Sequence, residues 1–353
     1  MNANYPKKCW YVAATSNEVA DAPLARRVLD RDIVLWRVAT GTVTAFEDGC
    51  AHRGFPLSRG RVVGDQLVCG YHGCVYDVDG RCVRVPTQPD VPTGMRVSTL
   101  PVLEDPPFIW IWGGTPNIAS SSQPPRTPWL NDVEWSTFSN GWRVAANYMM
   151  VHEHYLDFSY APTLHASDMP PGVERLPAFD DVEVTETTVS YSRVLPETPL
   201  ADWEAEATGL DRSGTYTRRE QETFASPAMH IQRWNIELHD DTAFCHIRTH
   251  AITPETPSST HVFMQVSRNY ATQLGGVTTI LRSRVDEITR RDTEILELAA
   301  AHAGYDGWRS GVEFRADAAV QRARRIVAVM LAKEAGRSAI RPGLPTPSNG
   351  ASA

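Results

Sequence analysis

The sequence contains no apolar run long enough to cross a membrane. No stretch of its 353 residues approaches the roughly 20 consecutive apolar residues that a spanning helix needs. Lys7 and Lys8 near the start are followed by WYVAATSNEV, which is too short and too polar for the apolar part of a signal peptide. We therefore expect a soluble, cytoplasmic protein without membrane contact.

A basic surface is also missing. The 34 Lys and Arg residues are outnumbered by 42 Asp and Glu residues, which gives a formal net charge of -8. Binding to the phosphates of nucleic acids requires clustered positive charge. The composition therefore argues against a nucleic-acid partner.

Cysteine is too scarce for a disulfide framework. The chain has six cysteines, and their spacing suggests no set of bridges in a protein of this size, which fits a reducing compartment. There is also no Gly-rich loop of the dinucleotide-binding type after a strand, so we expect no NAD(P)H site within the chain.

Two of the cysteines belong to short pairs of metal-binding residues. Cys50 pairs with His52 and Cys69 pairs with His72, with sixteen residues between the pairs. Two Cys and two His can hold zinc, but thiolates and imidazoles shared between two loops also suit the two irons of a Rieske [2Fe-2S] cluster. The spacing alone leaves both metals open.

The surrounding residues favour the cluster. Each loop carries one Cys, one His and a following glycine, whereas the second pair of a zinc finger is usually two His on a helix. The stretch CAHRGFPLSRGRVVGDQLVCGYHG from Cys50, with Tyr76-Asp77 and Gly80 after it, resembles the N-terminal domain of Rieske non-haem iron oxygenases. The resemblance implies that Cys50, His52, Cys69 and His72 hold a [2Fe-2S] cluster.

Turn signals and short β-prone runs predict that the first domain, residues 1–115, is all-β. The runs are residues 10–14, 33–38, 42–47 and 108–112, and a hairpin turn is expected at 77–80. Residues 116–128 are rich in Pro and Ser, which is typical of a linker.

The second domain, residues 129–335, is predicted to be an antiparallel sheet flanked by helices. Its β-prone runs are 182–190, 217–223, 230–238, 243–250 and 261–267, and its end has a helical pattern. The fold class is therefore α+β, and the resemblance implies a catalytic domain of the helix-grip type. Residues 336–353 have the composition of a disordered tail.

A helix predicted over residues 284–301 carries an acidic residue on its apolar side. The apolar stripe consists of Val285, Ile288, Ile295 and Ala299. Asp292 occupies the position that continues this stripe, and a carboxylate facing a core is costly without a partner. Either an arginine such as Arg291 or a metal ion would serve.

This helix and the segment from Asn147 to His165 resemble the catalytic domain of the same oxygenases. The family pattern in this domain is Glu-Asn-x-x-Asp-x-x-His-x4-His, followed much later by an acidic residue on a helix. In the family the two His and this acidic residue hold an iron(II) ion. The matching residues here are Glu153, Asp157, His165, Asp292 and Glu297. The resemblance implies that His165 and Asp292 bind iron.

The chain departs from the pattern at two positions. Tyr160 stands where the family has its first ligand His, and His154 stands where it has Asn. Tyr160 as a ligand, His154 as a replacement, and a weakly binding site are all open. A straight helix would separate His154 from His165 by about 16 Å, and Pro162 is expected to break the helix near Ala161. We therefore expect Tyr160 in or beside the coordination shell and His154 next to the ligands.

Asp157 has a separate role by resemblance. In the family the matching Asp bridges a cluster His of one subunit, here His72 or His52, to an iron His of the next subunit. Such contacts generate a closed head-to-tail ring, and we expect a homotrimer.

The substrate is predicted from the branch that the chain is most similar to. Trp10-Tyr11-Val12 and the run from His250 to Glu255 resemble the vanillate demethylase and dicamba monooxygenase branch. This implies an aromatic acid oxidised with O2 at a methoxy, methyl or ring position, with electrons from a separate NAD(P)H-dependent reductase, directly or through a ferredoxin.

Strand alternation identifies candidate substrate contacts. His246, Arg248 and His250 share one face of a strand, and His230, Gln232 and Trp234 share one face of another. We predict that Arg248, His250 and His230 hold the polar group of the substrate. The alternative function is a Rieske electron-transfer or substrate-binding protein whose altered second site binds iron weakly.

Overall fold

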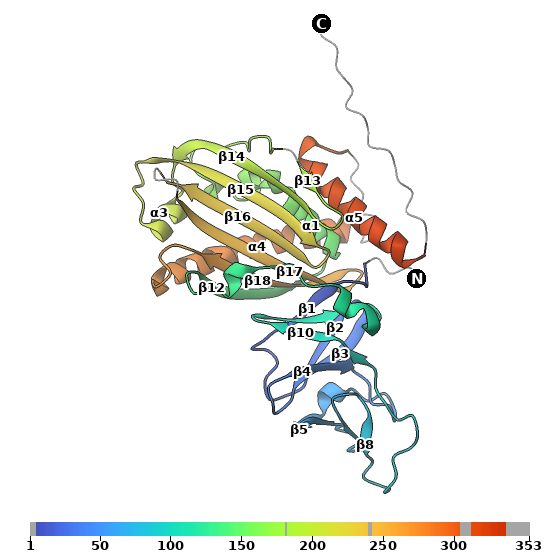
Figure 1. Cartoon of the computed structure of the whole chain (residues 1–353). Coiled ribbons are helices and arrows are strands. Elements are labelled where there is room, and N and C mark those ends of the chain that lie inside the picture. Colours follow the sequence, from blue (N-terminus) through green and yellow to red (C-terminus); the bar gives the residue numbers. More distant parts are fainter. Residues whose placement is uncertain (1–4, 181, 239–241, 304–311, 337–353) are drawn as a thin grey trace.

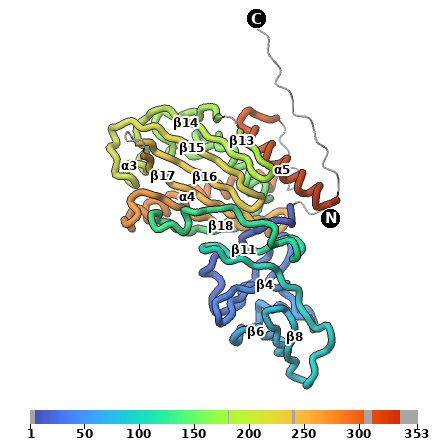
Figure 2. Tube along the Cα trace, in the orientation of Figure 1, coloured from blue at the N-terminus to red at the C-terminus, as the bar shows by residue number. Residues whose placement is uncertain are grey.

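The computed structural model describes residues 5–180, 182–238, 242–303 and 312–336. Apart from residue 336, the predicted disordered tail lies outside the described residues. Figures 1 and 2 show two parts in sequence order, a smaller one coloured blue to cyan and a larger one coloured green to red. Among the described residues, no helix is both long and apolar enough to span a membrane.

The smaller part consists of three antiparallel sheets, which confirms that the first domain is all-β. The three-stranded sheet has the order β1 (Trp10–Thr15), β11 (Phe108–Trp112) and β10 (Val102–Asp105). The second sheet has the order β2 (Leu24–Val28), β3 (Arg31–Arg37), β4 (Val43–Glu47) and β9 (Thr99–Leu100). The third has the order β5 (Arg61–Val63), β6 (Gln66–Val68), β7 (Val75–Tyr76) and β8 (Cys82–Arg84).

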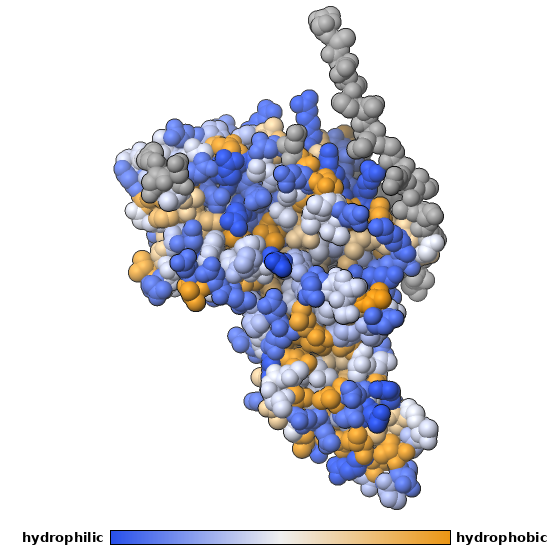
Figure 3. All heavy atoms as spheres, viewed as in Figure 1, coloured by the Kyte–Doolittle hydropathy of each residue, from blue (hydrophilic) through white to orange (hydrophobic). Residues whose placement is uncertain are grey.

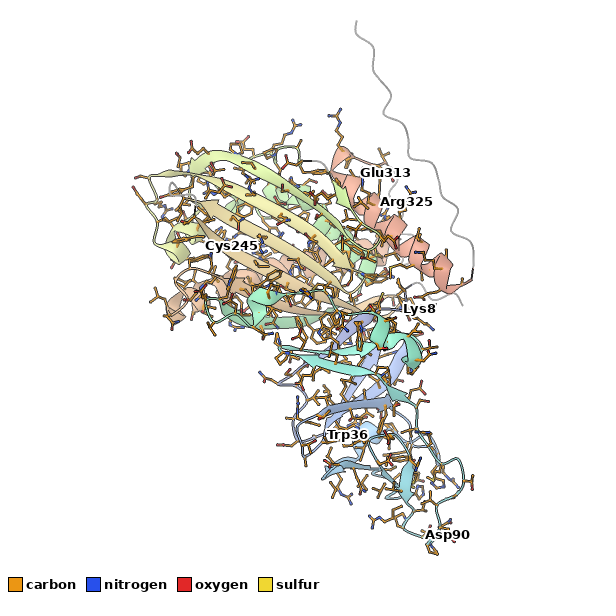
Figure 4. All side chains as sticks on the ribbon, viewed as in Figure 1. Lys8, Trp36, Asp90, Cys245, Glu313 and Arg325 are labelled. Atoms are coloured by element: carbon orange, nitrogen blue, oxygen red, sulfur yellow. The ribbon has the colours of Figure 1, made fainter. Side chains whose placement is uncertain are left out.

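A hydrophobic core that contains Trp36 and Phe46 of the second sheet and Leu67 and Tyr76 of the third joins these two sheets. Trp36 of β3 is fully buried, and its ring lies 5.8 Å from that of Phe46 on β4. Figure 4 shows Trp36 inside the smaller part and Asp90 at its far end. The turn predicted at 77–80 connects β7 to β8 and places Gly80 at a φ of 75°.

The larger part is built on one seven-stranded antiparallel sheet of order β12-β18-β17-β16-β15-β14-β13. The strands are β12 (Ser136–Val144), β13 (Glu183–Val184), β14 (Val189–Pro199), β15 (Thr215–Ser226), β16 (Met229–Glu237), β17 (Ala243–Thr256) and β18 (Ser259–Arg268). The α-helices are α1 (Tyr148–Leu156), α2 (Ala161–Leu164), α3 (Asp202–Thr208), α4 (Gly275–Ala303) and α5 (Ala318–Glu334). Helices α1, α4 and α5 contact strands of the sheet, and α1 contacts both of the others. The α+β prediction is confirmed.

Two predicted elements differ from the structure in more than the length of a strand. Residues 182–190 form a hairpin rather than one strand, because the Thr185 and Thr188 hydroxyls lie 2.7 Å apart and close a turn between β13 and β14. Helix α4 begins at Gly275, well before the predicted start. Its buried stripe includes Leu296, whereas Ile295 is 44% exposed, so the predicted stripe was wrong at that position.

The two parts are in direct contact. Strands β1 and β2 both contact β17, and the Thr253 hydroxyl donates to the Val12 carbonyl at 2.7 Å. The segment predicted as a linker contains a short 3-10 helix, Pro116–Ser121, and the Trp10 indole donates to the Ser122 carbonyl at 3.0 Å. This segment is therefore packed against the first strand instead of crossing open solvent.

Candidate active site

The two Cys-His loops of the smaller part have the same backbone geometry. In each loop the Cys N–H donates to the carbonyl five residues later, from Cys50 to Phe55 at 2.9 Å and from Cys69 to Cys74 at 2.8 Å. The glycine four residues after each Cys, Gly54 or Gly73, has a positive φ and donates back to the Cys carbonyl. Only a residue without Cβ adopts this conformation easily, which explains the glycine in each loop.

The four side chains form a layered donor set. Cys50 and Cys69 are buried, at 3% and 1% exposed, whereas His52 and His72 are exposed at the tip. The two imidazole rings lie 4.6 Å apart. Thiolates on the inside and imidazoles on the outside match the unequal ligand sets of the two irons in a Rieske cluster.

Asp292 of α4 contacts two histidines at once. Its Oδ1 lies 2.8 Å from His165 Nε2 and 3.2 Å from His154 Nε2. The three side chains are at most 9% exposed. Burial alone would raise the pKa of the Asp292 carboxyl, but the hydrogen bond with His165 and the nearby His154 imidazole hold that pKa well below its ordinary value. Arg291 is not the partner, because it pairs with Glu287 and Asp168.

The expectation that helix geometry keeps His154 away from His165 was wrong. The chain bends at Asp157, which ends α1 with a φ of −98° and a ψ of 81°. Ala161 is helical and begins α2, so the break does not occur there, and Pro162 lies in the first turn of that helix, where proline is tolerated. The bend brings both imidazoles to the same carboxylate.

Tyr160 lies against His154 rather than on Asp292. Their rings are nearly parallel, with centroids 4.1 Å apart and an interplanar angle of 17°. The Tyr160 ring centroid is 5.8 Å from that of His165. In the described part of the chain, no hydrogen bond joins the Tyr160 hydroxyl to Asp292 or His165.

A narrow cavity lies beside these residues. Its volume is about 50 Å³, and Tyr160, His165 and Asp292 form part of its lining. Gln232, Trp234, His246 and Arg248 come from the sheet and line the same cavity, together with Trp203, Arg284 and Ile288. Strands β16 and β17 pair Gln232 with Arg248 and Trp234 with His246, so the two faces that strand alternation predicted separately lie side by side in the sheet.

His230 and His250 lie outside the lining of this cavity. His230 is fully buried, with its Nε2 2.7 Å from Glu222 Oε2, and burial lowers its pKa to about 3. The His250 ring stacks on Tyr155 at 4.1 Å, with its Nε2 3.0 Å from Met264 Sδ. The sequence placed His250 on one face with Arg248 and His230 on one face with Gln232, but it did not show which residues of these faces meet the cavity.

Arg284 and Trp203 are cavity residues that the sequence interpretation missed. Arg284 lies over the Trp203 ring at 4.1 Å and forms an ion pair with Asp168. Burial lowers the pKa of its guanidinium to about 9, against the opposing effect of Asp168. The sequence did contain a signal for Arg284. Arg284, Ile288 and Asp292 are spaced four residues apart, and residues with this spacing share one face of a helix.

A second cavity lies on the other side of His154 and Tyr160. It has a volume of about 530 Å³, and His154, Asp157 and Tyr160 line it. Glu153 also lines it and forms two hydrogen bonds with Arg324 of α5, at 2.6 and 2.7 Å. Glu297 is on the surface, where it accepts from the Ala145 N–H.

Comparison with known proteins identifies the family. Residues 144–333 match the vanillate O-demethylase oxygenase C-terminal domain, and residues 9–98 match the Rieske [2Fe-2S] domain. The chain belongs to the vanillate O-demethylase oxygenase family of Rieske oxygenases. It is therefore a Rieske-type monooxygenase, an oxidoreductase with a [2Fe-2S] cluster.

Full-length relatives support this assignment. The vanillate O-demethylase oxygenase subunit of Pseudomonas sp. strain HR199 is 28% identical over 346 residues, which cover 94% of this chain and 96% of that protein. The dicamba O-demethylase oxygenase component of Stenotrophomonas maltophilia is 28% identical, over 91% of this chain and 97% of that protein. The crystal structure of dicamba monooxygenase with non-heme iron and dicamba has a TM-score of 0.81 and 25% identity, covering 94% of this chain and 98% of that one.

The residues of this oxygenase fit both metal groups. Cys50, His52, Cys69 and His72 would supply the mixed donor set of the cluster. At the second site His154 Nε2 is buried and makes no hydrogen bond of acceptable geometry, although Asp292 lies 3.2 Å away. Among the described residues no three His, Cys, Asp or Glu side chains are already arranged to hold a metal ion; at this site the imidazoles contact the carboxylate directly.

Proposed function

We propose that this chain is the oxygenase component of a multicomponent monooxygenase that O-demethylates an aromatic acid. Electrons would come from NAD(P)H through a separate reductase, directly or through a ferredoxin. One oxygen atom of O2 enters a methoxy C–H bond, and the other becomes water with two electrons and two protons. The resulting hemiacetal loses formaldehyde and leaves a phenol.

Arg248 is the residue that indicates the class of the substrate. Its guanidinium lines the same cavity as His165 and Asp292, and its Nε is buried without a hydrogen-bond partner. Among the described residues no carboxylate lies within ion-pair distance of Arg248. An arginine in a site of low exposure needs an anion, and guanidinium is shaped to bind a carboxylate in a bidentate manner. We infer that the substrate supplies this carboxylate.

The cavity walls also suit an aromatic ring. Trp234 and Phe158 face the space from the sheet side and from the segment after α1, and both line the cavity. The present volume of about 50 Å³ is far below the roughly 300–1,000 Å³ of occupied ligand sites. Binding therefore requires the walls to move apart. Phe158 belongs to a short 3-10 helix, Phe158–Tyr160, whereas Trp234 belongs to strand β16 of the sheet.

Electrons are proposed to enter from the side opposite to the substrate. When bound, the iron activates O2 with electrons delivered by the cluster. Asp157 lines the larger cavity behind His154, and its carboxylate accepts only from the Ser159 N–H at 3.1 Å among the described residues. A cluster His of a neighbouring subunit, His52 or His72, would meet Asp157 there, and the head-to-tail homotrimer that we propose would provide this contact.

The exposed end of the cluster domain fits such a contact. Tyr71 is 59% exposed and its ring lies 3.8 Å from that of His72. Val63, Val78 and Val83 are also at least 40% exposed in this domain. Figure 3 shows apolar residues over this end of the molecule. Apolar surface around a redox group is consistent with docking against another protein.

Product formation tests the proposal. The purified chain, loaded with iron(II), would be incubated with NADH, a compatible reductase and a panel of methoxybenzoates, and formaldehyde and phenol would be measured together. We expect equal amounts of both from at least one acid and none from its methyl ester. NADH oxidation without any product would instead support an electron-transfer or binding role.

A further inference from the structure

We propose that His154, and not Tyr160, completes the iron-binding triad with His165 and Asp292. This assignment names the ligands of the iron in the proposed function. It depends on the proposed function only because that function places iron at this site. In the family the first iron ligand is a His at the position of Tyr160, and the position of His154 is an Asn. Here His154 takes the role of that first ligand.

The first argument is convergence on one oxygen. His154 Nε2 and His165 Nε2 both approach Asp292 Oδ1, at 3.2 and 2.8 Å, from elements on either side of the bend at Asp157. Two imidazoles and one carboxylate directed at one point form the donor set that holds non-haem iron(II) and leaves positions open for O2 and substrate.

The second argument is the unsatisfied nitrogen. His154 Nε2 is buried, and its contact with Asp292 does not have hydrogen-bond geometry. A buried polar atom without a partner is unfavourable, so it points to a missing ligand. A metal ion among the three side chains would accept the Nε2 lone pair and relieve this cost.

The third argument is the orientation of Tyr160. Its ring lies flat on the His154 ring, at 4.1 Å and 17°. This stacking fixes the plane of the imidazole and leaves the phenol beside the triad. Since Tyr160 also lines both cavities, its position separates the substrate side from the Asp157 side.

The contact between His154 and Tyr160 explains how a ligand His at position 154 can replace one at position 160. The two side chains touch because α1 ends at Leu156 and the short 3-10 helix Phe158–Tyr160 turns back toward it. An imidazole at either position therefore starts within a side-chain length of Asp292. Moving the nitrogen donor from position 160 to position 154 keeps the number and type of ligands.

Metal content of four proteins tests the assignment: the wild type, H154N, Y160F and the double variant H154N/Y160H, which has the family pattern. Each is purified anaerobically, loaded with iron(II) and assayed for iron and acid-labile sulfide. Sulfide counts the cluster independently. We expect about three iron atoms per chain in the wild type and in Y160F, about two in H154N, and a return to about three in the double variant.

Spectroscopy supplies a second readout. Nitric oxide added to the iron(II) protein gives an electron paramagnetic resonance signal from mononuclear iron, which we expect to be lost in H154N and retained in Y160F. Loss of iron from Y160F with retention in H154N would overturn the assignment, as would a visible tyrosinate-to-iron(III) band that Y160F lacks. Because Y160F keeps the stacked ring, its result decides the question even if H154N folds poorly.

The outcome is separate from that of the proposed function. A protein that binds its third iron through His154 but forms no product would contradict the proposed demethylation and leave the ligand assignment intact. A wild-type protein that forms product and whose iron depends on Tyr160 would do the reverse.

Discussion

Arg248 on β17 faces Gln232 on β16, with Arg248 Nη1 3.4 Å from Gln232 Oε1. The amide nitrogen of Gln232 donates in turn to Glu222 Oε1 at 2.7 Å. Glu222 thereby orients the amide so that its oxygen faces the guanidinium. This chain of contacts supports Arg248 in the cavity without neutralising it through a direct ion pair.

Replacing Arg248 by alanine should weaken the binding of acidic substrates. A hydrogen bond to a charged group contributes about 1.5–3 kcal/mol, which corresponds to an increase in KM of about tenfold to 100-fold. The measurement is KM for an active methoxybenzoate in the wild type, R248A and R248K. We expect R248K to be intermediate, because it keeps the charge and loses the bidentate geometry. An unchanged KM in R248A would remove Arg248 from the substrate site.

Replacing Tyr76 by phenylalanine should lower the reduction potential of the cluster. The Ala51 N–H donates to the Tyr76 oxygen at 3.0 Å, so the Tyr76 hydrogen is available to Cys50 Sγ at 3.1 Å. That bond stabilises the sulfur more when the cluster is reduced and more negative. Its loss, at about 1 kcal/mol, lowers the potential by about 40 mV.

Redox titration of the cluster would measure this shift. Y71F is the matched control, because the Tyr71 side chain is exposed and in the described residues has no hydrogen bond to a cysteine. We expect the potential of Y71F to remain that of the wild type. A potential in Y76F equal to that of both other proteins would show that the hydroxyl does not donate to Cys50.

The cluster loops could be predicted from the sequence because their geometry is local. Cys50 and Cys69 each close a turn within five residues, and Gly54 and Gly73 indicate the positive φ that each turn needs. Strand alternation succeeded on β16 and β17 for the same reason, since facing side chains follow from one register.

The ligand set at Asp292 depends on a bend that no local pattern revealed. Pro162 was the visible signal for a break, but the chain turns at Asp157, whose own side chain caps the next turn by accepting from the Ser159 N–H. An Asp can begin or end a helix, so its identity does not fix the direction of the chain. The distance between His154 and His165 therefore required the structure.

Replacing Gly60 by alanine should prevent stable cluster binding. A Cβ at this position would lie 2.2 Å from the Val68 carbonyl oxygen and 2.9 Å from the Leu57 carbonyl oxygen. Real contacts are never that short, so the chain around Val68 would move and take the adjacent Cys69 with it. We expect visible absorption and sulfide content to fall to a small fraction of the wild-type values.

Gly49 provides the control for that substitution. A Cβ there meets no atom within 4 Å, although Gly49 directly precedes Cys50. G49A should therefore retain the cluster. Equal cluster content in G60A and the wild type would mean that the Val68 segment can shift without disturbing Cys69.

Glu222 should make the folded protein less stable as the pH rises. Burial raises the pKa of this carboxyl to about 8, despite Gln232 and Arg193, while the pKa in the unfolded chain is near 4.5. Below pH 4.5 both states hold the proton. Between pH 4.5 and 8 the unfolded state releases it and the folded state keeps it, so stability falls by up to about 1.4 kcal/mol per pH unit, and above pH 8 the loss is constant.

The variant E222Q removes this titration and should become more stable relative to the wild type from pH 5 to pH 8. Glutamine retains an oxygen and a nitrogen for His230 and Gln232, so its packing is nearly unchanged. The midpoint of urea unfolding, measured at pH 5, 6.5 and 8, gives the difference, and E206Q at an exposed position of α3 is the control. A constant difference between E222Q and the wild type would show that Glu222 is ionised in the folded protein, with its charge stabilised by Arg193 and by a protonated His230.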